Sequence, residues 1–159
     1  MKYLLVIDLQ REFVKGIHGK HVYARTLQYI YDHQRDYDGI YAAFYINNVE
    51  ENANMIRLVG WTEMMNKDEL EGLQFPYNYR ATHTGYSIQQ YPGFTKDDTV
   101  DIIGFDTDAC VLNACFDIFN LGCKMRILTK YIYSSGGMLM HLCGKLCMRR
   151  QFKKALYRE

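Results

Sequence analysis

The chain has 159 residues and a mass of 18.7 kDa, and we expect residues 1–159 to form a single domain. Hydrophobic residues make up 48% of it and charged residues 23%, which excludes a disordered or collagen-like protein. The net charge of +1 gives no overall field toward nucleic acid or an anionic membrane, so we predict neither as a partner.

Two features of the sequence bear on the compartment. Only five successive apolar residues precede Asp8, too few for the core of a signal peptide, and no apolar run approaches the roughly 20 residues that span a bilayer. The five cysteines are an odd number in a chain large enough to fold without disulfides. We therefore predict reduced cysteines and a cytoplasmic protein.

Short apolar runs alternate with helical patterns along the chain. The runs predict strands at residues 3–7, 40–46, 80–83, 100–105 and 125–128. The helical patterns cover residues 22–37, 52–58, 108–121 and 138–157, with Gly122 as the stop of the third. Continuously apolar strands are typical of a parallel sheet covered on both faces. We therefore expect a Rossmann-like three-layer α/β/α sandwich around a mainly parallel sheet of about five or six strands.

In such sheets ligands bind beyond the carboxyl ends of the strands, and two reactive residues stand there. Asp8 follows the first strand, and Cys110 follows the strand at 100–105. Thr107 and Asp108 are good N-caps, which would place Cys110 in the first turn of a helix. The free N–H groups of that turn favour a thiolate and can hold an oxyanion. Cys110 is therefore a candidate nucleophile with Asp8 as its proton acceptor, against the alternative of a buried, inert thiol.

Four parts of the chain, in order, resemble one protein family. They are LVIDLQREF at residues 5–13, FYINN and LVGW at 44–48 and 58–61, TGYS at 84–87, and GFDTDACV at 104–111. Together they resemble the metal-free branch of the isochorismatase-like cysteine hydrolases, over most of the chain from about Leu4 to Gly137.

This resemblance implies a catalytic triad of Asp, Lys and Cys, in which the cysteine attacks a carbonyl or imine carbon. Asp8 and Cys110 match the general base and the nucleophile. The position of the family's lysine is occupied by His83, while Lys67 and Lys96 lie too far along the chain to replace it. The resemblance thus implies a hydrolase of a small amide or a related C–N or enol-ether bond. The alternative is a catalytically silent relative that binds a small ligand or a protein partner.

The resemblance also implies further features of the site. Besides the triad of Asp8, His83 and Cys110, we expect four residues to contact the small-molecule substrate: Phe13, Tyr86, Thr107 and Ala109. The family places a non-proline cis peptide before the threonine of the nucleophile turn, here near Asp106–Thr107. Related proteins form homo-oligomers, and we expect the same here.

Metal and cofactor signals are weak. The related nicotinamidases bind a metal through an Asp-x-His pattern, and residues 46–52 contain no His, so we predict neither metal nor cofactor. His141, Cys143 and Cys147 have zinc-ligand chemistry but no evident fourth ligand, which favours core cysteines. Six basic residues between Lys145 and Arg158 predict a solvated helix face rather than a nucleic-acid contact.

Overall fold

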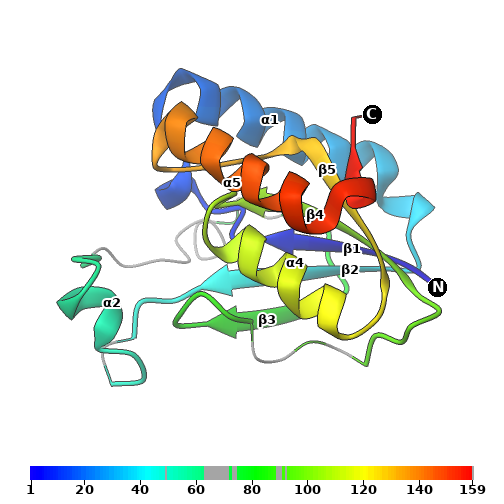
Figure 1. The fold of residues 1–159 in the computed structure, drawn as a ribbon, viewed down its shortest axis with the longest axis horizontal. Helices are drawn as coiled ribbons and strands as arrows, with labels where there is room; N and C mark the ends of the chain where they lie inside the picture. Colours follow the sequence, from blue (N-terminus) through cyan, green and yellow to red (C-terminus); the bar gives the residue numbers. More distant parts are fainter. Residues whose placement is uncertain (49, 63–71, 73–74, 89–90, 92, 159) are drawn as a thin grey trace.

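A parallel sheet runs through the centre of the computed structural model, which describes residues 1–48, 50–62, 72, 75–88, 91 and 93–158 (Figure 1). Its six strands are β1 (Lys2–Ile7), β2 (Gly39–Tyr45), β3 (Tyr79–His83), β4 (Thr99–Phe105), β5 (Lys124–Tyr133) and β6 (Leu156–Tyr157). They lie in the order β3-β2-β1-β4-β5-β6, and every neighbouring pair is parallel. The strand order reverses direction at β1 and β4, the place where ligands bind in sheets of this kind.

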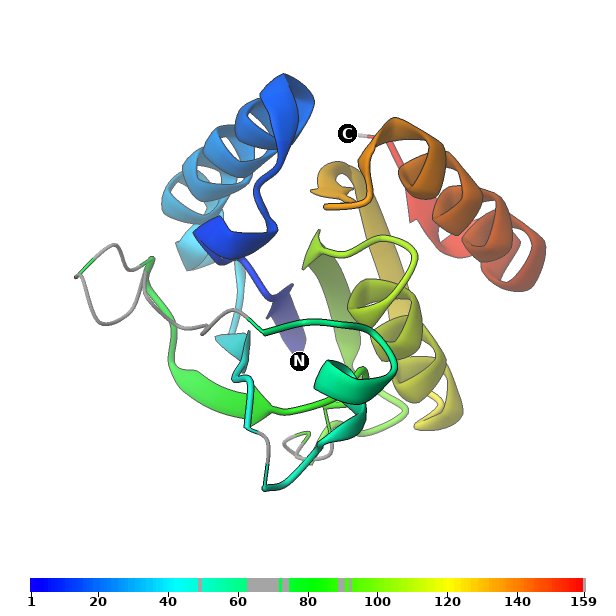
Figure 2. The same ribbon diagram turned by 90° about the vertical axis from the view of Figure 1, so that its left-hand side faces the viewer.

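Helices cover both faces of the sheet, which confirms the predicted three-layer α/β/α sandwich. Helix α1 (Gly16–His33) lies on one face, and α4 (Cys110–Asn120) and α5 (Gly137–Phe152) lie on the other side (Figure 2). The short helix α2 (Asn54–Arg57) lies at the carboxyl ends of the strands, the end toward which β1, β2 and β3 point in Figure 1. No helix in the described part of the chain is both long and apolar enough to cross a membrane.

The apolar strands pack on both faces, as their composition predicts. On β1, Leu4 and Val6 belong to the core beneath α1, whereas Leu5 and Ile7 belong to the core beneath α4. All four are at most 2% exposed. Alternate side chains of a strand point to opposite faces, so a strand buried on both sides needs an unbroken apolar run.

One feature at each end of β4 fixes the position of this strand. Gly104 on β4 has φ of 122°, and a Cβ there would lie 1.9 Å from the carbonyl oxygen of Ile7. Only glycine allows this approach of β4 to the end of β1. At the other end of β4, the buried carboxylate of Asp101 accepts hydrogen bonds from the hydroxyl of Tyr37 (2.8 Å) and Nε of Arg126 (2.6 Å).

The boundaries of several elements differ from the predictions. Helix α1 begins at Gly16 instead of 22, and β5 continues to Tyr133, beyond the predicted end at 128. The predicted helix over 138–157 ends at Phe152, after which a short 3-10 turn leads into β6. Helical spacing alone did not reveal this last strand, since two residues are too few to show a period of two. Strand β6 is fixed instead by pairing with Ile127 and Leu128 of β5.

Candidate active site

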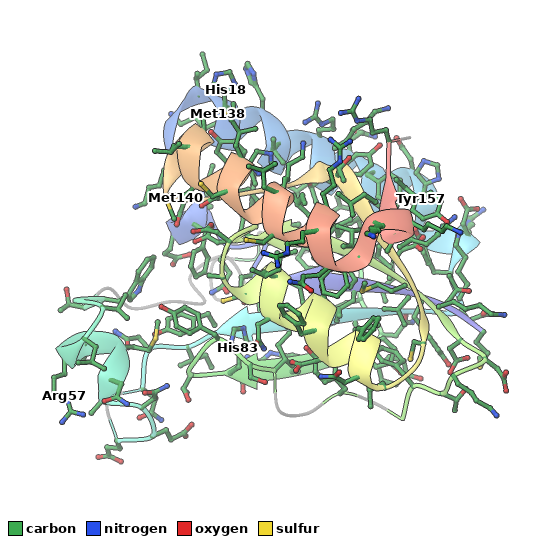
Figure 3. The ribbon with its side chains drawn as sticks, viewed as in Figure 1. His18, Arg57, His83, Met138, Met140 and Tyr157 are labelled. Carbon is green, nitrogen blue, oxygen red and sulfur yellow. The ribbon has the colours of Figure 1, made fainter. Side chains whose placement is uncertain are left out.

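The acid at the end of β1 lies in the middle of the candidate site. Asp8 is fully buried, and its N–H donates to the carbonyl of Ala43 on β2 (3.0 Å). Its Oδ1 accepts a 2.7 Å hydrogen bond from Nε2 of His83, the last residue of β3. His83 lies at the carboxyl end of the sheet, on the side of α2 (Figure 3). The sheet thus brings together two residues that are 75 positions apart in the sequence.

Both ring nitrogens of His83 face acceptors. Nδ1 donates to the carbonyl of Gly85 (2.6 Å), while Nε2 faces the Asp8 carboxylate. Burial lowers the pKa of His83, but the negative charge of Asp8 and the two hydrogen bonds outweigh it, so the pKa is raised above 6.5. Because each nitrogen needs a proton to serve its acceptor, the geometry favours the imidazolium form.

Cys110 begins α4 and completes the cluster. The sulfur, a carboxylate oxygen of Asp8 and a ring nitrogen of His83 all lie within 4.8 Å of one another. Burial and the charge of Asp8 raise the pKa of the Cys110 thiol well above its ordinary value. The expectation that the helix start favours a thiolate is therefore wrong for the resting protein. The side chain is only 6% exposed, and desolvation beside a carboxylate outweighs the dipole of α4.

The turn before Cys110 differs in detail from the predictions. Ala109 is the N-cap of α4, and no side chain caps it, so neither Thr107 nor Asp108 has the predicted capping role. The hydroxyl of Thr107 is instead hydrogen bonded to Nδ1 of His141 on α5 (2.9 Å). The cis peptide is Phe105–Asp106, one bond before the expected position.

An apolar cavity of about 320 Å³ opens onto Cys110. Its apolar wall consists of Phe13, Tyr45, Met55, Val59, Trp61, Tyr86, Ala109 and Met140. Three of the four predicted substrate contacts, Phe13, Tyr86 and Ala109, thus line the same space as the thiol. Thr107 does not: it is fully buried and outside the lining, because its side chain is turned toward His141. The structure therefore corrects the expectation that Thr107 contacts substrate directly.

The polar groups of this cavity are few and unusual. Oδ1 of Asp108 and Nε1 of Trp61 are buried and have no hydrogen-bond partner among the described residues. Burial raises the pKa of Asp106 to about 7, although hydrogen bonds from the N–H and hydroxyl of Ser135 lower it. Both residues line the cavity, but these two atoms are covered by protein, so a ligand could pair with them only after a side-chain rotation.

Gln10, in the segment 5–13 that resembles the family, is a positioning residue to which the sequence alone assigns no role. Its amide nitrogen donates to the carbonyl of Tyr45 (3.1 Å), and its amide oxygen accepts the N–H of Tyr45 (2.8 Å). This double contact ties the loop after Asp8 to the end of β2. The available signal was a polar residue two positions after Asp8 at the end of an apolar strand; Gln10 is in fact fully buried.

Metal-binding chemistry is limited among the described residues. Their only cluster of three or more potential ligand groups is Asp8, His83 and Cys110 themselves, and both ring nitrogens of His83 already have acceptors as partners. Cys143 and Cys147 are exposed, so they are not the core cysteines that we predicted; their positions on α5 face outward. Of the two lysines considered as replacements for His83, Lys96 is exposed and Lys67 lies outside the described residues.

Comparison with solved structures identifies the fold. No family model and no curated protein matches the sequence. N-carbamoylsarcosine amidase from Thermoplasma acidophilum aligns with a TM-score of 0.76 and 17% identity, over 99% of this chain and 95% of that one. The pyrazinamidase/nicotinamidase from Streptococcus mutans aligns with a TM-score of 0.75 and 16% identity, over 99% and 100%. An isochorismatase family protein from Desulfovibrio vulgaris gives 0.68 and 13%, over 94% and 90%. The chain has the fold of these proteins, as the sequence resemblance implies.

Proposed function

We propose that the chain is a cysteine hydrolase that cleaves a small amide or a related C–N or enol-ether bond. The observation that carries this proposal is the cluster of Asp8, His83 and Cys110 behind an apolar cavity. A thiol, a carboxylate and an imidazolium within 4.8 Å of one another can serve as a nucleophile, a base and a charge stabiliser. The solved structures that share the fold include two named amidases, which supports the same reaction class.

In this proposal the thiol of Cys110 loses its proton only during attack. Oδ2 of Asp8, which has no partner among the described residues, takes the proton as the sulfur bonds to the carbonyl carbon. The developing oxyanion is stabilised by the N–H of Cys110 at the start of α4, since the N–H groups of Ala109 and Val111 already donate to the carbonyl of Asp106. Collapse expels the amine, which takes the proton back from Asp8 and leaves a thioester. Asp8 then deprotonates a water that hydrolyses the thioester, and the thiol is restored.

His83 would replace the lysine of the related enzymes by placing a positively charged ring beside the Asp8 carboxylate. The charge lowers the cost of a buried carboxylate, and it offsets the negative charge that grows on sulfur and substrate. A lysine keeps its charge to about pH 10.4, whereas His83 keeps its charge only below its raised pKa. We therefore expect the rate to fall as the pH rises through the pKa of His83, and His83→Lys to retain activity at higher pH.

The cavity favours a flat or apolar substrate with both a donor and an acceptor. Aromatic rings from Phe13, Tyr45 and Trp61 supply broad apolar contact. A rotation of the buried Asp108 or Trp61 side chain toward the cavity would let Oδ1 accept from a substrate N–H or let Nε1 donate to a substrate oxygen or nitrogen. Asp108→Asn would then weaken substrate binding more than it slows the chemical step.

One observation favours the alternative of a silent binding protein. The thiol of Cys110 is buried and protonated at rest, and the site holds His83 instead of a lysine. A relative that has lost catalysis would keep the cavity and bind a small ligand without cleaving it. Accumulation or turnover of a thioester distinguishes the two functions.

The test is hydrolysis of a panel of simple aromatic and aliphatic amides, with mass spectrometry of the protein during turnover. We expect an acyl group on Cys110, no turnover in Cys110→Ala, and a loss of at least about 10²-fold in His83→Ala. His83→Lys should keep or increase the rate. Cys143→Ala, which removes an exposed thiol on α5, is the matched control and should be unaffected. An unchanged rate in Cys110→Ala would refute the mechanism.

Three further expectations stay predictions. A metal-free site predicts that a chelator leaves hydrolysis unchanged. Leu139 and Leu146 on α5 are 73% and 65% exposed, which supports a homo-oligomer, and light scattering on the purified protein tests it. The predicted cytoplasmic location requires cell fractionation.

A further inference from the structure

A basic groove lies over the open edge of β5, between α1 and α5. It has a volume of about 390 Å³, and six of its lining residues carry cationic or imidazole groups: His18, His21, Arg25, Lys130, His141 and Lys145. No carboxylate lines it among the described residues. We propose that this groove binds a small phosphate-bearing ligand. It shares no lining residue with the cavity at Cys110, so it is a second site.

The net charge of +1 conceals a strong separation of charge along the chain. Residues 118–158 contain nine Lys and Arg and no Asp or Glu, and residues 13–31 contain three Lys and Arg and no Asp or Glu. The first segment forms β5 and α5, and the second contains most of α1. The fold places these two acid-free segments on either side of the groove. An anion there is attracted by three formal cations without a competing carboxylate in the lining.

Both helices turn a matching face to the groove. On α1 the contributing residues are His18, His21 and Arg25, and on α5 they are Met138, His141 and Lys145. Each set has the spacing i, i+3, i+7, which lies along one side of a helix. His18 and Met138 are at the start of their helices, where the figure shows them close to each other (Figure 3).

The floor of the groove is the part of β5 that β6 leaves uncovered. Strand β6 pairs only with Ile127 and Leu128, whereas β5 continues to Tyr133. Lys130 projects from this uncovered stretch and lines the groove. Because β6 is short, it leaves room for a ligand beside Lys130 at the edge of the sheet.

His141 is the buried recognition group of the site. Its ring is only 7% exposed, yet it lines the groove. Its Nδ1 is occupied by the hydroxyl of Thr107, which leaves Nε2 as the ring nitrogen for a ligand. Burial and the charge of Lys145 lower the pKa of His141 to about 4, so the ring is neutral at pH 7. The proposed site requires the tautomer in which the Thr107 hydroxyl donates to Nδ1, because Nε2 then carries the proton and donates to the ligand.

The chemistry of the lining selects phosphate among small anions. Arg25 supplies a planar fork of donors, Lys130 and Lys145 supply point charges, and His141 supplies a neutral N–H donor. A dianionic phosphoryl group uses more of these donors than a single carboxylate can. The exposed Met138 and Leu142 beside them offer apolar contact to an organic portion of the ligand. The groove is open to solvent, and its volume of about 390 Å³ fits a small molecule, whereas a nucleic acid would extend further along α5, over Arg149.

Isothermal titration calorimetry with inorganic pyrophosphate, at about 150 mM constant ionic strength, tests the proposal. We expect binding to the parent protein, and a loss of affinity of about tenfold in each of Arg25→Gln and Lys145→Gln. Lys20→Gln and Arg149→Gln are matched controls, because they remove the same charge from the same two helices outside the groove lining. They should stay within about twofold of the parent.

Three results would overturn the site. One is no pyrophosphate binding up to about 1 mM. Another is an equal loss of affinity in the control variants, which would mean diffuse attraction to a basic surface. The third is tighter binding of a single-stranded oligonucleotide that depends on Arg149 as much as on Arg25, which would mean a nucleic-acid surface. Thermal melting of each variant confirms that it is folded, and none of these results depends on hydrolysis at Cys110.

Discussion

Replacing Asp106 by Asn should make the protein more stable at alkaline pH. Asp106 lies in the turn before Cys110 and lines the cavity there. Burial raises the pKa of its carboxyl from 3.8 to about 7. Asn keeps both hydrogen bonds to Ser135, since its amide oxygen can accept the N–H and its amide nitrogen can donate to the hydroxyl. The substitution therefore removes the ionisation and little else.

The sign and size of the expected change in the free energy of unfolding follow from the pKa of Asp106. The folded protein holds the Asp106 proton more tightly than the unfolded chain, so the stabilisation from Asp106 is complete below pH 3.8. It is lost as the pH rises through about 7. The shift is about 3 pH units, and at 1.36 kcal/mol per unit it amounts to about 4 kcal/mol. Asp106→Asn avoids this loss, so its advantage over the parent should grow from near zero to about 4 kcal/mol.

Urea unfolding of parent and variant at about pH 4 and about pH 8.5 measures this difference. Asp97→Asn is the control for the change in net charge, because Asp97 is exposed on the loop before β4. The reasoning would be refuted if Asp106→Asn changed the free energy of unfolding by the same amount at both pH values, because such a change would come from packing instead of ionisation.

Three further outcomes are expected. Gly104→Ala should lower the free energy of unfolding in urea by about 3 kcal/mol or more, because the new Cβ would lie 1.9 Å from a β1 carbonyl oxygen and φ is positive. Gly93→Ala is the control and should change it little, because the space around Gly93 is open. Arg126→Met should cost about 3 kcal/mol, since it leaves a buried carboxylate without its guanidinium, and a cost below about 1 kcal/mol would contradict this. Iodoacetamide should label exposed Cys143 faster than Cys110 at neutral pH, because burial and Asp8 raise the pKa of Cys110; the reverse order by peptide mapping would contradict that.

The sheet could be predicted because burial on both faces leaves a local signature. The strands predicted at 3–7 and 40–46 are uninterrupted apolar runs, and the one at 100–105 is interrupted only by Asp101 and Gly104; each prediction agrees with the structure to within one or two residues. Strand β6 and the second half of β5 could not be predicted, because they depend on pairing and helix packing between distant residues. The exposed Lys130 within β5 breaks the apolar run, which hides the continuation of the strand from a local pattern.

The location of the candidate site could be predicted from the sequence, but the protonation states of its residues could not. The rule that ligands bind at the carboxyl ends of parallel strands selects Asp8 and Cys110 from sequence order alone. The protonation states depend on burial and on the partner of each group, and these are properties of the folded chain. The helix start at Cys110 predicted a lowered pKa, whereas burial of the thiol and the charge of Asp8 raise it. The role of Thr107 likewise depends on its hydrogen bond to His141, which is 34 residues away and cannot be inferred from a local pattern.

In the proposed hydrolase, His83 takes the place of a lysine, and the way β3 ends allows the shorter histidine side chain to reach Asp8. The last pair of β2 and β3 sets Tyr45 beside His83, and the N–H of Ile46 donates to the carbonyl of His83 (2.9 Å). The backbone of His83 is thus fixed one strand away from β1, and its ring reaches Asp8 across the end of β2. The chain then turns so that the carbonyl of Gly85 faces the second ring nitrogen. That carbonyl and Asp8 together hold the ring in its charged form, which a lysine would keep without such help. The sequence Thr82-His83-Thr84-Gly85 therefore supplies both the cation and the acceptor that keeps it charged, and the proposed hydrolase requires both of a substitute for lysine.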